Sequence, residues 1–167
     1  FIWEPVYIPL YLHLSLGMSW EVLGPLFALM LLPYLLIELP MGFLEDRFRG
    51  GRIVMGLGFV VLALSLAAFS LIGPATHIPF IAAVLVAMSS GAALVEITAQ
   101  TSFFRSVGGQ DAETVSFFRM TRPLGMLAGP VIGSFLLGLM PLEYIFIPLG
   151  ALTLLGALAY GELCAMM

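Results

Sequence analysis

The sequence contains no lysine, one cysteine and two histidines among its 167 residues. The single Cys164 excludes an internal disulfide framework and any site made from several cysteines. The two histidines, His13 and His77, are too few and too isolated to predict a metal site. A GxxxxGK phosphate-binding loop is absent, so ATP is not an expected energy source. We therefore expect no metal, no cofactor and no catalytic residues.

Charge is also scarce, at 10% of the residues, whereas hydrophobic residues make up 61% and the mean hydropathy is +1.11. Soluble domains carry roughly 45–50% apolar and about 25% charged residues. So few charges cannot cover a surface that faces water, and the basic residues form no patch that could follow a phosphate backbone. The expected surroundings are a lipid bilayer, and nucleic acid is not an expected partner.

Six apolar segments separated by polar turns predict an all-α, polytopic membrane protein. A helix that crosses a bilayer core needs about 20 apolar residues. Ser19 and Asp111 are predicted N-caps, Gly73 and Pro74 end a helix, and Pro141 suits the first turn of the last one. The predicted helices are 1–14, 20–44, 51–72, 78–104, 111–140 and 141–163. Residues 1–167 are thus expected to form one transmembrane domain of six helices, of which the first is cut short.

The basic residues are distributed unevenly about these predicted crossings. All six lie on one side of the membrane or within the adjoining part of the fifth helix: Arg47, Arg49, Arg52, Arg105, Arg119 and Arg122. The opposite side carries no basic residue other than the two histidines, and Trp20 suits an interfacial anchor there. By the positive-inside rule, we expect the arginine-rich side to be cytoplasmic in the cell membrane.

The most highly charged short stretch is GFLEDRFRGGR, residues 42–52. It resembles the cytoplasmic turn motif of the major facilitator superfamily, which links the second and third helices of each six-helix half. Gly42, Asp46 and Arg47 match the motif in register, whereas Arg49 stands where the family usually has glycine. The resemblance implies close helix packing at Gly42 and an interaction between Asp46 and the start of the fifth helix. A carboxylate near a helix N-terminus contributes about 0.3–1 kcal/mol.

A second stretch, GMLAGPVIG in the fifth predicted helix, resembles the glycine–proline motif of antiporters in the same superfamily. Its residues are Gly125, Gly129, Pro130 and Gly133. The three glycines are four residues apart, so they also form a stripe that allows close approach of a neighbouring helix. We favour this packing role over a role specific to antiport.

The resemblance implies a transporter of twelve helices in two similar halves, so these six helices correspond to one half. The chain opens inside an apolar segment, and YIPLYLHLSLGMSW resembles the start of the second half in some bacterial members. We therefore expect the C-terminal half, with a missing N-terminal half of the same chain as its partner. The glycine–proline motif, better known from first halves, favours the opposite assignment.

Four charged residues are predicted to share one depth in the membrane: Glu38, Glu96, Arg119 and Arg122. Each lies roughly 10–17 Å from the cytoplasmic end of its helix at 1.5 Å per residue. A lone charge at a helix centre costs about 2.5–3.5 kcal/mol on insertion scales, so mutual pairing is expected. Three roles remain open for this network: a brace or cytoplasmic gate, a proton-coupling site, and a substrate contact.

Three function classes are compatible with the pattern to different degrees. The first is half of a secondary active transporter that moves a small solute by alternating access. The second is a membrane scaffold or sensor with a transporter-like fold that does not transport. The third is an intramembrane enzyme, which we rank lowest because no nucleophile and base are predicted to share one depth. Flux of solute into sealed vesicles would distinguish the first class from the second.

Overall fold

The computed structural model describes residues 4–44, 51–107 and 112–166, apart from the side chains of 4–5, 38–44, 52 and 160–166. All secondary structure in these ranges is helical. The elements are α1 (Glu4–Leu10), the π-helix η1 (Tyr11–Ser15), α2 (Trp20–Leu44), α3 (Gly51–Phe69), α4 (Ile78–Val107), α5 (Ala112–Leu139), the 3-10 helix η2 (Leu142–Tyr144) and α6 (Phe146–Met166). The prediction of an all-α protein is confirmed.

Four segments among the described residues are long and apolar enough to cross a membrane. They are Trp20–Ile37, Ile78–Val107, Ala112–Leu139 and Leu142–Ala159, and Ile53–Phe69 is a shorter apolar helix. The described residues therefore support four candidate spans, and the prediction of six spans is not confirmed.

Two predicted helix boundaries differ from the structure for local reasons: the end of the third helix by three residues and the start of the sixth by five. The third helix ends at Phe69 instead of residue 72, because the amides of Leu71 and Ile72 bond three residues back, to Ala68 and Phe69, and tighten the chain into a turn. Pro141 is not in the first turn of α6. Its ψ of 152° is extended, and η2 intervenes before α6 begins at Phe146.

Other boundaries agree with the sequence or differ by a single turn. Ser19 directly precedes α2, and its carbonyl oxygen accepts hydrogen bonds from the amides of Val22 and Leu23. The fourth helix continues three residues beyond the predicted end, to Val107. The predicted cap Asp111 lies outside the described residues.

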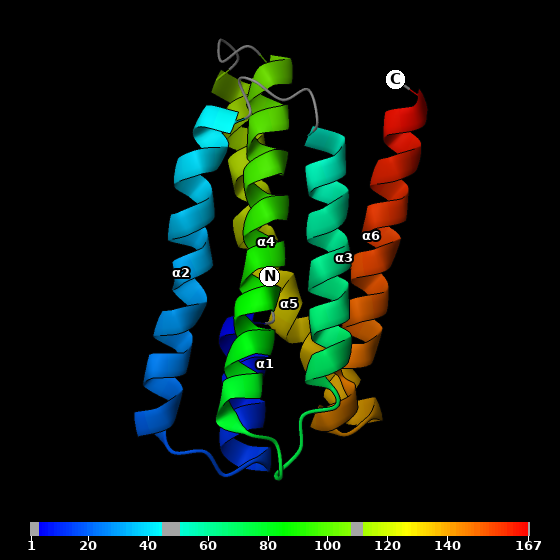
Figure 1. The fold of residues 1–167 in the computed structure, drawn as a ribbon. Helices are drawn as coiled ribbons and strands as arrows, with labels where there is room; N and C mark the ends of the chain where they lie inside the picture. Colours follow the sequence, from blue (N-terminus) through cyan, green and yellow to red (C-terminus); the bar gives the residue numbers. More distant parts are fainter. Residues whose placement is uncertain (1–3, 45–50, 108–111, 167) are drawn as a thin grey trace.

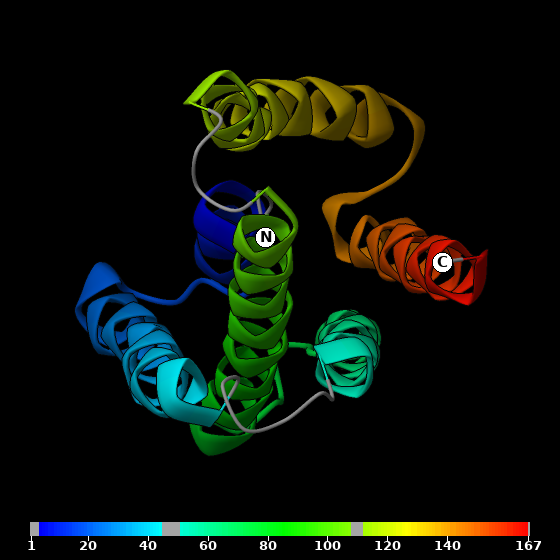
Figure 2. The same ribbon diagram turned by 90° about the horizontal axis from the view of Figure 1, so that it is seen from above.

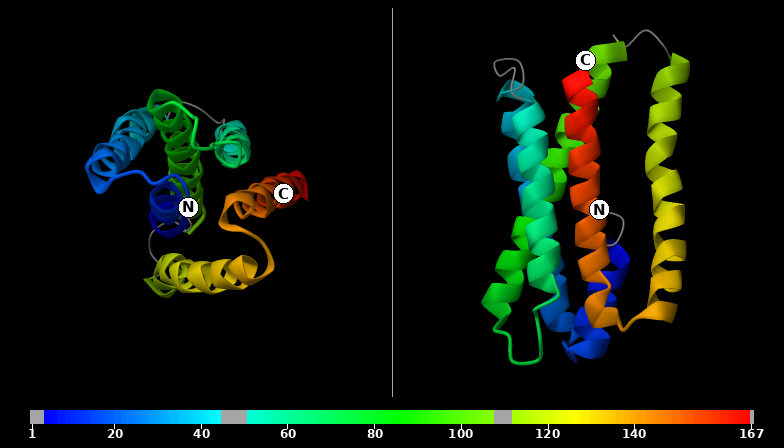
Figure 3. Two further views of the ribbon diagram at one scale, coloured as in Figure 1. Left: turned by 90° about the horizontal axis from the view of Figure 1, so that it is seen from below. Right: turned by 90° about the vertical axis from the view of Figure 1, so that its right-hand side faces the viewer.

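The long helices run roughly along one axis (Figure 1). The C-terminal ends of α2 and α4 and the N-terminal ends of α3 and α5 lie at the same end of the bundle. Seen from above, α4 lies between α2 and α3, and α6 lies beside α3 (Figure 2). α5 lies at the edge of the bundle, with α1 between it and α4 (Figure 3). Arg105, Arg119 and Arg122 are therefore all in the half of the bundle where α4 ends and α5 begins.

Two glycines bring α3 and α4 into close contact. A Cβ built on Gly91 of α4 would lie 2.8 Å from the carbonyl oxygen of Gly58 and 2.7 Å from the amide nitrogen of Leu62 on α3. On its other side α3 meets α6, where a Cβ on Gly150 would lie 3.4 Å from the carbonyl oxygen of Ala63. Small residues thus let backbones approach closely, as is usual between membrane helices.

An aromatic cluster closes the opposite end of the bundle. Phe69 and Phe146 are fully buried with ring centroids 4.7 Å apart, and the ring of Tyr11 packs against both. The Tyr11 hydroxyl donates a hydrogen bond to the carbonyl oxygen of Ile72, just past the end of α3. This cluster connects η1, α3 and α6. The polar site lies in the other half of the bundle, where α4 ends and α5 begins (Figure 1).

Candidate functional site: a charged pocket between α3, α4 and α5

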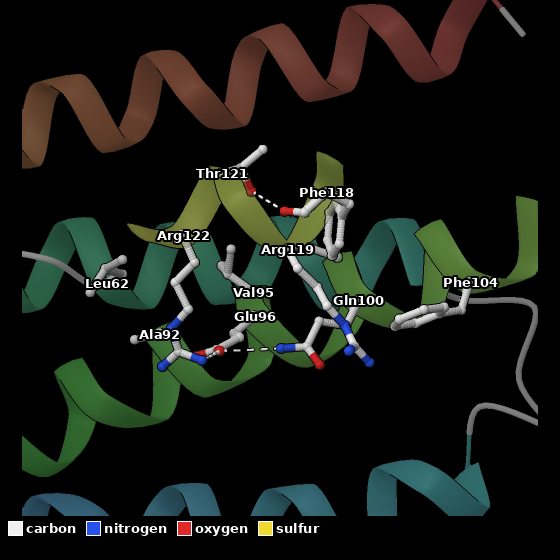
Figure 4. A pocket seen from close by; sticks show the side chains of 11 residues that line it. Leu62, Ala92, Val95, Glu96, Gln100, Phe104, Phe118, Arg119, Thr121 and Arg122 are labelled. Carbon is white, nitrogen blue, oxygen red and sulfur yellow. Dashed lines mark hydrogen bonds and ion pairs between the residues drawn. The ribbon is translucent and has the colours of Figure 1, made fainter. Parts of the chain in front are cut away.

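A pocket of about 450 Å³ lies where α5 faces α4 and α3 (Figure 4). α4 contributes most of its walls, α5 contributes the cations, and Leu62 closes it from α3. The lining residues are Leu62, Ala92, Val95, Glu96, Ala99, Gln100, Phe104, Phe118, Arg119, Thr121 and Arg122. Its volume is within the range of about 300–1,000 Å³ that is typical of small-molecule sites.

An ion pair crosses this pocket from α4 to α5. The Nη1 atom of Arg122 lies 2.8 Å from the Oε1 atom of Glu96, and the Glu96 side chain is 22% exposed whereas that of Arg122 is 55% exposed. Gln100, one turn further along α4, donates from Nε2 to the same Glu96 oxygen at 3.2 Å. Gln100 thus supports the Glu96 carboxylate directly.

Arg119 lies one turn before Arg122 on α5 and lines the same pocket. Its side chain extends from α5 toward Gln100 of α4 (Figure 4). Among the described residues, no carboxylate forms an ion pair with Arg119. The structure therefore brings together three of the four predicted charges, Glu96, Arg119 and Arg122. The backbone of Glu38 is in α2, and its side chain is outside the described part.

Aromatic rings close the pocket toward the C-terminal end of α4 and the N-terminal end of α5. Phe103 and Phe118 stack with ring centroids 3.9 Å apart and planes within 9° of parallel. Phe104 packs edge-on against Phe118 at 6.3 Å, and both line the pocket. These ring contacts link α4 to α5, and two of the rings also form part of the pocket wall.

The glycine–proline motif lies further along α5, from its middle toward its C-terminal end. Gly129 and Gly133 are the two buried residues of this helix, whereas Gly125 is half-buried. The carbonyl oxygen of Pro130 accepts a hydrogen bond from the hydroxyl of Tyr7 on α1 at 2.9 Å. The motif thus lies on the side of α5 that contacts α1. The roles assigned to its residues remain predictions.

The cytoplasmic turn motif falls largely beyond the described structure. Gly42 belongs to α2, whereas Asp46 and Arg47 lie outside the described residues. The implied contact between Asp46 and the start of α5 therefore stays a prediction. In the described part of the chain there is no cluster of three or more potential metal ligands. His13 instead faces the backbone carbonyl of Met18, at 2.8 Å from Nδ1, and its ring packs at a tilt of 32° against the ring of Trp20.

Sequence reasoning missed two parts of this arrangement. It favoured helix packing over cavity lining for Ser89, Ser90 and Gly91, but it did not consider Gly58. Only the crossing of α3 and α4 shows that these glycines meet. The sequence also gave no reason to place Thr121 and Leu62 in a binding pocket, because both residue types are common in membrane helices. A helical projection of residues 118–122 would have placed Phe118 on the face of Arg122.

A sequence model of the Major Facilitator Superfamily matches residues 5–163. The chain belongs to this superfamily. It is a membrane protein of a family of transporters, and the resemblance at residues 42–52 is consistent with that membership. Comparisons with curated proteins and with solved structures found no match.

Proposed function

We propose that this chain forms one half of a secondary active transporter that moves a small solute by alternating access in the cell membrane. The observation that carries the proposal is the Glu96–Arg122 ion pair beside a 450 Å³ pocket in otherwise apolar helices. Charges at membrane depth are expensive, and they typically mark solute or ion pathways. The arginine-rich end is cytoplasmic, and a second six-helix half completes the pathway.

The contacts of α5 with its neighbours support the proposal that this helix moves during transport. α3 packs backbone to backbone against α4 and α6 through Gly58, Gly91 and Gly150. α5 buries only Gly129 and Gly133, and its described contacts include the ion pair to Glu96, the stack on Phe103 and the hydrogen bond from Tyr7. Discrete polar and aromatic contacts can break and re-form at lower cost than an interdigitated apolar interface. In the proposed cycle, the Glu96–Arg122 pair breaks when α5 moves away from α4.

Proton coupling follows from the same pair. A carboxylate that loses its cation in an apolar site is stabilised by taking up a proton. Glu96 would therefore carry a proton while Arg122 is displaced. The Glu96→Gln variant is then expected to keep solute exchange in counterflow and to lose uphill uptake driven by an inward proton gradient. Loss of both activities together would contradict a proton-carrying role.

The experiment that tests transport is solute flux in proteoliposomes containing the full-length natural protein. A panel of small anionic, neutral and cationic solutes is loaded, and radiolabelled counterflow is measured with and without a proton gradient. The proposal predicts saturable counterflow of at least one solute. Correctly folded protein that exchanges none of them would favour the scaffold or sensor alternative.

A further inference from the structure

The described lining of the pocket carries an excess of positive charge. Two arginines and one glutamate contribute, which leaves a formal charge of +1 after Glu96 is paired with Arg122. Gln100 donates a hydrogen bond from Nε2 to Glu96, so this polar side chain of α4 supports the carboxylate that is already paired. Arg119 therefore supplies a guanidinium whose charge no described carboxylate balances. A cation at this depth in a bilayer calls for an opposite charge.

The remaining walls are apolar and aromatic. Leu62, Ala92, Val95 and Ala99 supply aliphatic surface, and Phe104 and Phe118 supply two rings beside Arg119. A small inorganic anion would leave most of this surface without contact. A ligand that fits both features has a planar anionic group for the guanidinium and an apolar body for the walls. Arginine suits the first requirement because its fork can hold a carboxylate through two parallel hydrogen bonds.

We infer that the pocket binds a small organic anion, a carboxylate joined to an apolar body, with Arg119 as its anchoring cation. This inference rests on the proposed function and names the substrate class of the same pocket. In the proposed site, the Glu96–Arg122 pair forms part of one wall, and Arg119 is available to the ligand. The apolar body lies against Phe104, Phe118 and the aliphatic wall.

The test is equilibrium binding to the full-length natural protein in nanodiscs, with two matched pairs of probes. Radiolabelled 2-naphthoate and octanoate are compared with 2-naphthamide and octanamide, which keep the shape and remove the charge. Both carboxylates should bind saturably, and each amide should bind at least about tenfold more weakly, because hydrogen bonds between two charged groups are stronger than those to a neutral amide. Equal affinity for acid and amide would overturn the inference.

Variants localise the effect. Arg119→Gln should weaken binding of the carboxylates about tenfold and leave the affinity for the amides unchanged. Arg119→Lys should weaken carboxylate binding less, because the positive charge remains. Arg105→Gln is the control, since Arg105 is exposed at the end of α4 and does not line the pocket. It should stay within twofold of the wild type. If the counter-charge of Arg119 is Glu38 rather than a solute, Arg119→Gln will not weaken binding, which overturns the inference.

The outcomes separate this inference from the proposed function. A protein that exchanges neutral or cationic solutes and binds neither carboxylate remains a transporter, and the anion site is wrong. A protein that binds the carboxylates through Arg119 but exchanges no solute has the anion site, and the proposed transport is wrong.

Discussion

Gly58 of α3 and Gly91 of α4 meet backbone to backbone: a Cβ on Gly91 would lie 2.8 Å from the Gly58 carbonyl oxygen. Real Cβ atoms essentially never approach other heavy atoms this closely, and the obstructing atoms belong to backbone. The contact fixes the spacing of the two helices that carry Leu62 and Glu96. It therefore sets the width of the pocket on the α3 side.

The first prediction concerns this contact. Gly91→Ala should lower the free energy of unfolding by about 1–3 kcal/mol, because overpacking forces the two helices apart. Gly56→Ala is the matched control, since a Cβ at Gly56 would meet nothing within 4 Å. Thermal unfolding of the purified protein in detergent compares them. Equal apparent Tm values for the two variants would mean that the close crossing does not exist.

The second prediction concerns the Glu96–Arg122 pair. In a double-mutant cycle of Glu96→Gln and Arg122→Gln, the pair should show a coupling energy of about 0.5–3 kcal/mol, because each single variant strands the partner's charge. Chemical denaturation in mixed micelles measures the four proteins. Strictly additive effects would show that the two side chains do not interact.

A related comparison separates intramembrane charge from loop charge. Arg122→Ala should reduce expression, thermal stability and flux far more than Arg49→Ala, because the first leaves Glu96 without its cation at membrane depth. Arg49 belongs to the predicted cytoplasmic turn, outside the described residues. Indistinguishable behaviour of the two variants would remove the case for a charge network.

A further prediction concerns the contact between α1 and α5. Tyr7→Phe removes the hydrogen bond to the Pro130 carbonyl oxygen and should cost about 0.6 kcal/mol, the average for such bonds between membrane helices. Tyr144→Phe is the control, because Tyr144 is exposed in η2. The unfolding free energies of the two variants should differ by that amount. A larger loss in Tyr144→Phe than in Tyr7→Phe would contradict the assignment.

Much of the fold could be predicted from the sequence because bilayer crossing is a strong local constraint. Apolar length and turn residues located α2 and α4 to within one turn, and shared depth indicated that Glu96, Arg119 and Arg122 belong together. Depth follows from counting residues along one helix. It requires no knowledge of how the helices are arranged around each other.

What could not be predicted depends on rotation and packing between helices. The meeting of Gly58 and Gly91, the support of Glu96 by Gln100, and the approach of Leu62 to the pocket all depend on which faces meet. Most of these helices carry apolar residues on all their faces, so their sequences give little indication of which face meets which neighbouring helix. The start of α6 was missed because an extended Pro141 and a short 3-10 turn satisfy the same local signals as a helix start.

The central claim is that α5 moves away from α4, and so from α3 packed against it, during the cycle, and that the Glu96–Arg122 pair opposes this movement. Double electron–electron resonance between spin labels at Ile53 and Ser116 tests it most directly. Both positions are exposed, near the start of α3 and of α5, and the native cysteines, including Cys164, are replaced beforehand. In nanodiscs the account predicts two distance populations, with the longer one enriched by Arg122→Ala. A single narrow distance, the same with and without Arg122, would contradict it.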